Sequence, residues 1–470
     1  MKLKNIMTAF IAGTMLTGLA SCDGYLDLTP SSQLPADGAI TEYGDVEAAL
    51  NGAYETLTSN KYYGADFISR GEVGGEDVQT RSNSSRTENY YRFIYKQANA
   101  PEGLWYLPYK TINRVNVLLN AINSGEVAAS EEVNHAKGEA LALRALCHFN
   151  TTLIYGYPYL KDNGASLGAP IVKTVLAAND LPTRSTVADS YKSVEQDLAD
   201  ALPLVTDEVN NGHINKWAIL GLQARVYMNK GEYAKAFNCA KTIIEEGPYS
   251  LTPNEEYVDS WEAEYNKESI FDLHISQYAS GNRELFGYLC DPKGYNAIAA
   301  TDEFISLINE NADDVRIGLL SKDNAGQKTV IMKYPGRDGK STVNNVRIVR
   351  LSEIYLLAAE AALRMDTPNQ AKADEYLKAI QKRAIPSTGD VTATIDLVLK
   401  ERRKELVLEG YRLYDILRNN LSVKREGGRH FLSSVDLIEV NWNDYRCVLP
   451  VPQAEIDANP NVASQQNPGY

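Results

Sequence analysis

Residues 214–248, INKWAILGLQARVYMNKGEYAKAFNCAKTIIEEGP, carry the clearest helical pattern in the chain. Two helical segments meet at a turn built on Gly231, and small residues on either side would let the two helices approach closely. The match to a tetratricopeptide repeat is partial, because the repeat's Trp and Leu positions in the first helix fall on Leu220 and Gln223. The residues that follow the repeat's spacing are Ala224, Tyr227, Gly231, Tyr233, Ala236 and Pro248.

A related helical pair follows over residues 350–383, RLSEIYLLAAEAALRMDTPNQAKADEYLKAIQKR. Helical hairpins of this kind cannot bury their apolar faces alone, so several of them must stack. Helical periodicity also predicts a helix that starts near residue 43 and two more over 108–122 and 131–155. We therefore predict a mainly α fold, with a scaffold of tetratricopeptide-like helical hairpins.

Two segments lack this periodicity. Residues 64–101 are rich in Gly, Ser and Asn, which predicts a loop-rich segment. Residues 253–347 lose helical regularity and contain short β-rich pieces at 269–275 and 329–334. We expect these parts to form an irregular lobe of loops and short strands that lies on the helical scaffold.

The N-terminus has the pattern of a secretory signal. Lys2 and Lys4 precede an apolar run, Ile6–Leu19, which is shorter than the ~20 residues that a membrane-spanning helix needs. The run ends in Leu-Ala-Ser before Cys22, and this sequence resembles a bacterial lipobox, in which the cysteine sulfur carries diacylglycerol. We predict a signal peptide over 1–21 and lipidation of Cys22; a plain signal peptide with an accidental cysteine is the alternative.

Composition argues against several classes of protein. Lys plus Arg number 47 and Asp plus Glu 61, a net charge of −14 without a basic run, so the chain is a poor partner for nucleic acid. Four further cysteines show no CxxC spacing, and we interpret them as unpaired thiols, with no zinc site or disulfide framework. These are Cys147, Cys239, Cys290 and Cys447.

No motif of a known catalytic site fits. Residues 164–168, GASLG, match G-x-S-x-G, but a serine-hydrolase elbow needs a strand before Ser166 and a helix directly after it, and Pro170 opposes that helix. The chain has five His and no HExxH, P-loop or dinucleotide-binding glycine pattern. We therefore predict that the protein is not an enzyme, and we assign it no cofactor and no metal-ligating residues.

Two C-terminal stretches are distinctive. The first, residues 401–418, ERRKELVLEGYRLYDILR, places three glutamates at i, i+4 and i+8, where like charges repel. We interpret Glu401, Glu405 and Glu409 as an ion-paired face rather than as catalytic carboxylates, with Arg402, Arg403 and Arg412 at hand as partners. The second stretch, residues 448–470, VLPVPQAEIDANPNVASQQNPGY, is rich in Pro and Asn and reads as an extended strap along the scaffold.

Together with the lipobox, these two stretches resemble the SusD/RagB family of nutrient-binding outer-membrane lipoproteins of Bacteroidetes. The family's chains end in a Pro-x-Pro-x-x-Glu-Ile pattern followed by Asn-Pro and a final Gln-Asn-Pro-Gly-Tyr, found here from Pro450 to Tyr470. The resemblance covers the whole mature chain. It implies an N-terminal SusD-like region over 22–230 and a C-terminal SusD/RagB region over 231–470, which contains the irregular lobe.

The resemblance also implies a function. The protein would be lipid-anchored through Cys22 in the outer membrane, facing the cell exterior, and would lie as a lid over a SusC-type TonB-dependent transporter. It would catch a soluble oligosaccharide and deliver it for import without catalysis. A peptide ligand in the same family role, or a tetratricopeptide-type adaptor that binds a partner protein, is the alternative.

Carbohydrate binding requires flat aromatic rings and short polar side chains, and residues 77–95 and 278–296 supply both. These segments fall in regions from which family members draw ligand contacts; ordinary loop tyrosines are the competing interpretation. The candidate ligand-binding residues are Arg81, Asn89, Tyr90, Tyr91, Tyr278, Asn282, Arg283, Tyr288 and Tyr295.

Overall fold

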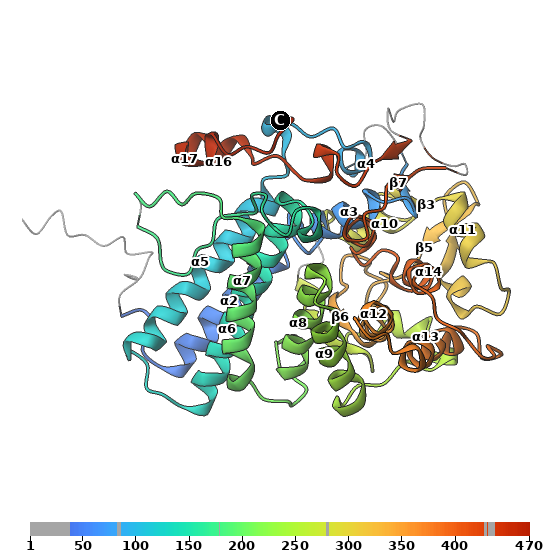
Figure 1. The fold of residues 1–470 in the computed structure, drawn as a ribbon, viewed down its shortest axis with the longest axis horizontal. Coiled ribbons are helices and arrows are strands. Elements are labelled where there is room, and N and C mark those ends of the chain that lie inside the picture. Colours follow the sequence, from blue (N-terminus) through green and yellow to red (C-terminus); the bar gives the residue numbers. More distant parts are fainter. Residues whose placement is uncertain (1–37, 82–85, 178, 279–281, 427–429, 431–437) are drawn as a thin grey trace, which may run out of the picture.

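The computed structural model describes residues 38–81, 86–177, 179–278, 282–426, 430 and 438–470. The predicted signal peptide and Cys22, the predicted lipidation site, therefore lie outside the described residues. Within them the fold is mainly α-helical, as predicted. Figure 1 shows helices from the first half of the chain on the left, and short strands, loops and further helices from the second half on the right.

Within the described residues the α-helices fall into two groups, ten helices of the scaffold and six others. The first group is α2 (Tyr43–Leu57), α5 (Gly103–Ser124), α6 (Glu131–Tyr155), α7 (Val187–Ala201), α8 (Lys216–Lys230), α9 (Tyr233–Glu246), α12 (Leu351–Arg364), α13 (Gln370–Ala384), α14 (Ile395–Leu406) and α15 (Arg412–Arg418). The second group is α3 (Asp66–Val73), α4 (Glu88–Arg92), α10 (Phe286–Cys290), α11 (Asp302–Ile308), α16 (Gln453–Ala458) and α17 (Pro460–Ala463).

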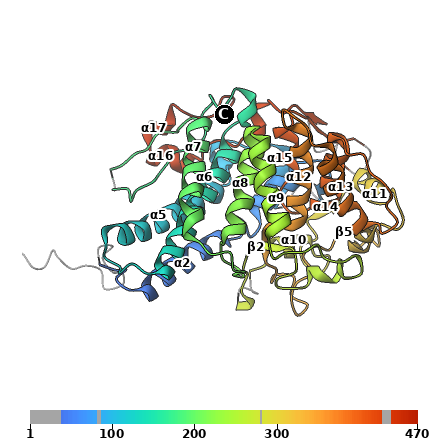
Figure 2. The same ribbon diagram turned by 60° about the horizontal axis from the view of Figure 1, so that its bottom comes forward.

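The long helices stack as the sequence predicted. Figure 2 shows α6, α7, α8 and α9 side by side, and α9 packs in turn on α12, which forms a hairpin with α13. The α8–α9 turn closes at Gly231, whose φ of +82° is a left-handed conformation that glycine adopts without strain. Both predicted helical pairs are thus confirmed as hairpins within one continuous stack.

The short strands pair antiparallel in four two-stranded sheets among the described residues. Both predicted β-rich pieces contain a strand, one in the second pair and one in the third. The pairs are β1 (Val78–Thr80) with β3 (Ile298–Ala300), β2 (Ser269–Leu273) with β6 (Val346–Arg350), β4 (Leu320–Lys322) with β5 (Lys328–Ile331), and β7 (Val423–Lys424) with β8 (Glu439–Val440).

One buried apolar cluster runs through the helical scaffold and the lobe alike. The predicted division into 22–230 and 231–470 stays a prediction; its boundary falls in the α8–α9 turn, and the cluster has members on both sides of it. No helix among the described residues is long and apolar enough to cross a membrane.

The structure corrects the prediction of a loop-rich segment over 64–101. This segment contains α3, and Gly71 lies inside that helix rather than in a turn. A Cβ at Gly71 would collide with the backbone of Gly410, so the glycine allows close packing of two chain segments. Glu72 of the same helix accepts hydrogen bonds from the backbone N–H groups of Leu408 (2.8 Å) and Gly410 (2.8 Å).

The C-terminal strap is also partly corrected. Residues 448–470 pack along the scaffold but include the short helices α16 and α17, so they are not wholly extended. Buried Asn467 holds the segment in place, because its side-chain amide donates to the backbone carbonyls of Tyr155 (2.9 Å) and Leu449 (2.7 Å). Trp105 of α5 donates to Glu455 of α16 at 3.1 Å, so this tryptophan belongs to the scaffold.

The glutamates of the 401–418 stretch are ion-paired, as predicted, but the predicted partners are wrong. Glu405 is fully buried and lies 2.9 Å from Arg350, 2.5 Å from Arg383 and 3.1 Å from Arg316. Burial alone would raise the pKa of Glu405, but these guanidinium groups outweigh it and hold the pKa well below its usual range.

The other two glutamates use the same cations and one lysine: Glu409 pairs with Arg350 and Lys333 (2.6 Å each), and Glu401 with Arg316 (2.7 Å). These partners come from elsewhere in the chain, so sequence proximity could not reveal them. The arginines that the sequence proposed as partners are used differently: Arg402 pairs with Asp415, Arg403 with Asp77 and Arg412 with Glu76.

Candidate functional site

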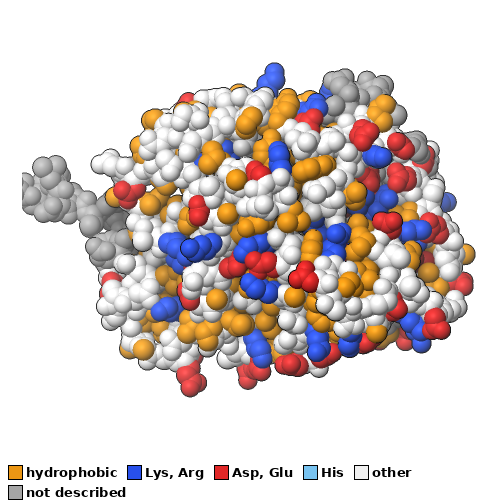
Figure 3. Space-filling view, in the orientation of Figure 1, with side chains coloured by type: hydrophobic (Ala, Val, Ile, Leu, Met, Phe, Trp, Pro, Cys, Tyr) orange, Lys and Arg blue, Asp and Glu red, His pale blue; other side chains and the backbone are white. Residues whose placement is uncertain are grey.

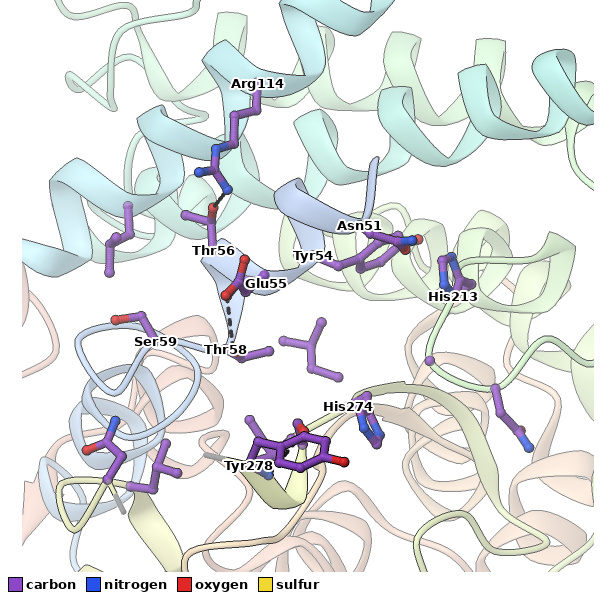
Figure 4. A pocket seen from close by; sticks show the side chains of 18 of the residues that line it. Asn51, Tyr54, Glu55, Thr56, Thr58, Ser59, Arg114, His213, His274 and Tyr278 are labelled. Atoms are coloured by element: carbon purple, nitrogen blue, oxygen red, sulfur yellow. Dashed lines mark hydrogen bonds between the residues drawn. The ribbon is translucent and has the colours of Figure 1, made fainter. Parts of the chain in front are cut away.

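A hollow of about 1070 Å³ opens between α2, α5 and the chain that follows β2 (Figure 4). Helix α2 contributes one wall with Asn51, Tyr54, Glu55 and Thr56, and α5 contributes another. The remaining lining residues come from the loop before α8, from Tyr265, and from the end of β2 and the loop after it. The hollow therefore lies where the helical scaffold meets the irregular lobe.

The α5 wall presents Leu107, Lys110 and Arg114. Residues four apart on a helix lie on the same face, so Lys110 and Arg114 are neighbours along this wall. Nη1 of Arg114 donates to Thr56 Oγ1 (2.7 Å) and to the Gly52 carbonyl oxygen of α2. Arg114 thus joins α5 to α2 at the edge of the hollow, and Figure 4 shows its bond to Thr56.

Buried Glu139 of α6 anchors two of the lining residues. The Tyr54 hydroxyl donates to Glu139, and His213 Nδ1 lies 3.0 Å from its Oε2. The contact with Glu139 raises the pKa of His213, while burial opposes the shift. Burial would raise the pKa of Glu139, but hydrogen bonds from His135 and His213 outweigh it, and the pKa is lowered.

The opposite side of the hollow carries an exposed aromatic ring. Tyr278 is 90 % exposed and lies near His274 in Figure 4. His274 Nδ1 lies 3.0 Å from Glu264 Oε1, and Tyr265 lines the hollow beside it. An apolar ring that stands in water beside a hollow is a typical platform for the C–H face of a sugar.

A second hollow of about 610 Å³ adjoins the first and shares Ser59 and Leu107 with it. Tyr106 of α5 lines it and is 59 % exposed, and Asp66 lies in its wall. Burial raises the pKa of the Asp66 carboxyl to about 6. Together the two hollows present exposed tyrosines, amides and charged side chains along one side of α5.

The structure brings the two predicted ligand segments together. Strand β1 pairs with β3, and Arg86 forms an ion pair with Glu284 while its guanidinium lies 3.6 Å from the centre of the Tyr295 ring. Of the predicted residues, four line a hollow: Tyr278 and Asn282 the first, and Asn89 and Tyr90 the second.

The other predicted residues lie outside the linings of these two hollows. Tyr91 is fully buried, with its hydroxyl 2.9 Å from His430 Nδ1. Arg81 is paired with Asp323 at 2.8 Å. Tyr288 packs edge-on against Tyr295, with ring centres 5.0 Å apart, and Arg283 is exposed 5.9 Å from the Tyr288 ring. A ligand role for these five residues stays a prediction without support from the geometry of the hollows.

Sequence analysis missed several lining residues. On α5, Tyr106, Lys110 and Arg114 follow an i, i+4, i+8 spacing, so a polar and aromatic stripe on an otherwise apolar helix could have revealed them. His213 and His274 lie in non-helical segments, and nothing in their local sequence marks them.

The serine motif has no elbow geometry. A turn precedes Ser166, and an isolated bridge between Leu167 and Thr186 follows it instead of a helix. The Ser166 Oγ is buried and has no hydrogen-bond partner in the described part of the chain. The four described cysteines are free, and Cys239 alone among them is not fully buried.

Comparison with known proteins covers most of the chain. Residues 267–470 match the family described as the SusD family, and residues 24–228 match the one described as "Starch-binding associating with outer membrane". A SusD superfamily protein from Bacteroides vulgatus is 37 % identical, with 92 % of this chain and 100 % of that one aligned at a TM-score of 0.86.

Another SusD superfamily protein, from Bacteroides thetaiotaomicron, is also 37 % identical, over 91 % of this chain and 100 % of that one, at a TM-score of 0.85. The SusD-like protein P25 of Formosa agariphila is 23 % identical over 100 % of both chains.

Proposed function

The chain belongs to the SusD family of carbohydrate-binding proteins, and from this membership we propose that it binds an oligosaccharide in the hollow between α2 and α5. The bound oligosaccharide would pass, chemically unchanged, to a SusC-type TonB-dependent transporter. The family is non-catalytic, and its description associates it with the outer membrane.

The observation that carries this proposal is the pairing of an exposed ring with polar side chains around an open hollow. Tyr278 offers a flat apolar face, and Asn51, Asn211 and Asn282 offer amide donors and acceptors for hydroxyl groups. Affinity would arise from stacking and hydrogen bonds, with no covalent step. The hollow lies at the junction of scaffold and lobe, so both parts would contact the ligand.

Anchoring and partner form the second part of the proposal. Acylation of Cys22 would hold the protein on the outer membrane, facing the exterior, where it can close over a transporter. Mass spectrometry of the protein from native membranes tests the anchor: an acylated Cys22 at the mature N-terminus supports it, and an unmodified thiol there contradicts it. Co-purification with a TonB-dependent barrel tests the partner.

Calorimetric titration against oligosaccharides and peptides tests the binding function. Heat of binding with oligosaccharides alone supports the proposal, and heat with peptides alone would assign the alternative ligand class. Binding to neither class would contradict the proposal and favour an adaptor role. Replacement of Ser166 with Ala should leave binding unchanged, because no step depends on that hydroxyl.

A further inference from the structure

We propose that the ligand of this hollow is an acidic oligosaccharide, one that carries carboxylate or sulfate groups. The inference rests on the proposed function, since it concerns the same hollow, but it names a charge class that neither the fold nor the family specifies. Lys110 and Arg114 on the α5 wall carry it, because both side chains line the hollow and neither forms an ion pair within the part of the chain that the structure describes.

The guanidinium group of Arg114 is held in place while its Nε–Nη2 edge makes no hydrogen bond within the described residues. Nη1 donates to Thr56 Oγ1 and to the Gly52 carbonyl oxygen, while Nε and Nη2 make no hydrogen bond within the described residues. The Nε–Nη2 edge of a guanidinium matches the two oxygens of a carboxylate or sulfate. Because the side chain is half-buried and already fixed by α2, it would lose little further freedom when an anion binds.

Lys110 supplies a second positive charge one helical turn away. It is exposed and forms no ion pair with a carboxylate of the described residues, and its Nζ lies 6.0 Å from the centre of the Tyr106 ring. Lys61, which lies against the start of α5 at Gly103, extends the same wall into the second hollow and also forms no ion pair there. The wall thus presents Lys110 and Arg114 one helical turn apart, beside the exposed Tyr106 ring.

The carboxylates around the hollow do not cancel these charges. Glu55 is the one carboxylate among the residues that line the first hollow, and it forms no ion pair with Lys110 or Arg114. Glu139 and Glu264 lie nearby but are paired with His213 and His274.

In the second hollow, the lining carboxylates are Glu102 and Asp66, and Arg86 there is paired with Glu284. Lys61 acts electrostatically on Asp66, whereas no carboxylate of the described residues forms an ion pair with Lys110 or Arg114.

The rest of the protein makes this wall distinctive. The chain carries a net charge of −14, and the face shown in Figure 3 mixes acidic and basic side chains closely. Many basic side chains elsewhere are paired, among them Lys230 with Glu195 and Lys372 with Glu375. Unpaired cations that line a hollow in an acidic protein indicate that the missing anion comes with the ligand.

A glycan array that contains neutral, uronate-bearing and sulfated oligosaccharides tests the charge class with the purified mature protein. Each acidic member is paired with its neutral counterpart, made by reduction of the carboxylates or by desulfation. We expect the acidic members to bind at least tenfold more tightly than their counterparts at low salt, and the difference to shrink as NaCl rises. The carboxylate and sulfate arms distinguish the two sources of charge.

Variants locate the effect on the α5 wall. Lys110→Gln should weaken the acidic ligand about three- to fivefold, which is more than it weakens the neutral counterpart. Arg114→Lys keeps the charge but loses the fork, and should weaken the acidic ligand about tenfold. Lys192→Gln, an exposed lysine of α7 outside both hollows, is the matched control and should bind like the wild type. Thermal unfolding of each variant checks that the fold is kept.

Each outcome either supports or overturns the inference that the ligand is acidic. A preference for acidic members that is reduced by Lys110→Gln and by Arg114→Lys, but not by Lys192→Gln, supports the inference. Binding of neutral oligosaccharides alone, or equal binding of each acidic member and its counterpart, overturns the inference and leaves the proposed function intact. Binding of no oligosaccharide of any class overturns both.

Discussion

Two charged regions of this protein differ in whether their side chains form ion pairs within the described residues. Behind α14, the side chains of Glu405, Glu409 and Arg350 are buried, and each lies within 3.2 Å of an oppositely charged group. Along the hollow beside α5, Lys110 and Arg114 have no carboxylate partner among the described residues. Buried charges that pair with one another stabilise the fold, whereas unpaired charges that line a hollow are available to bind a ligand.

The buried network also explains why the lobe is firmly attached. Arg350 ends β6, Arg316 and Lys333 belong to the lobe, and Arg383 belongs to α13, so the glutamates of 401–409 connect parts far apart in the sequence. A buried charge that loses its partner is destabilising, because it keeps the cost of desolvation without the compensating attraction. Because the two regions differ, a substitution in the buried network should lower the free energy of unfolding most, and a substitution at the hollow should mainly lower ligand affinity.

The largest effect is expected from Arg350→Met. This substitution leaves Glu405 and Glu409 buried with fewer cationic partners, and we expect the free energy of unfolding to fall by about 3–5 kcal/mol. Urea unfolding followed by circular dichroism measures it, with Lys192→Gln as a surface control that should shift the value by less than about 0.5 kcal/mol. A loss below about 1 kcal/mol for Arg350→Met would mean that the network does not fasten the lobe.

The next effect should appear in binding and not in stability. Tyr278→Ala removes an exposed ring from the hollow, and we expect oligosaccharide binding to weaken about two- to tenfold, because an aromatic contact contributes about 0.5–1.5 kcal/mol. Calorimetric titration measures it. Tyr43, 44 % exposed on α2 and outside the linings of both hollows, provides the matched control as Tyr43→Ala. Equal affinity of both variants and the wild type would place the ligand elsewhere.

The reverse pattern is expected at Tyr91. Its hydroxyl is hydrogen-bonded to His430 and its ring lies under the Arg425 guanidinium at 4.1 Å, so its environment is that of the interior. Tyr91→Phe should cost about 1 kcal/mol of unfolding free energy and leave ligand affinity unchanged. A clear loss of affinity with unchanged stability would support the ligand role that the sequence predicted for Tyr91.

Tyr91 and Tyr278 show which features of the site the sequence could predict and which it could not. Helical periodicity predicted the hairpins because each apolar face reports burial directly, and α8–α9 and α12–α13 follow it. Composition predicted two tyrosine-rich segments, and the structure places them together through the ion pair of Arg86 with Glu284 and the contact of Arg86 with the Tyr295 ring. Sequence could not tell which ring is 90 % exposed and which is fully buried, since that depends on contacts with residues as distant as 425 and 430.

The same limit applies to charge. The spacing of Glu401, Glu405 and Glu409 correctly predicted that they need partners, but the partners come from 316, 333, 350 and 383 rather than from adjacent arginines. The α3 helix was missed for a related reason: its glycine permits a close approach to Gly410 that no local pattern reports. Local patterns thus predict elements, and long-range contacts decide which side chains are free.

The smallest effect concerns the floor of the hollow, where His213 and Glu139 pair and share a dependence on pH. The pKa of His213 is raised, so its contribution to stability is present below its unfolded pKa near 6.5 and is lost as pH rises through the folded value. The pKa of Glu139 is lowered, so its contribution is present above its unfolded pKa near 4.5 and is lost as pH falls through the folded value. Both contributions are therefore complete between about pH 4.5 and 6.5.

His213→Gln removes the part that is lost at high pH. The wild type should exceed this variant in unfolding free energy by less than about 1 kcal/mol at pH 5.5, because the histidine is partly exposed, and the excess should vanish by pH 8.5. Lys192→Gln should keep the wild-type profile. An excess that stays constant over this range would show that His213 acts through packing against Tyr54, 4.7 Å away between ring centres, and not through its charge.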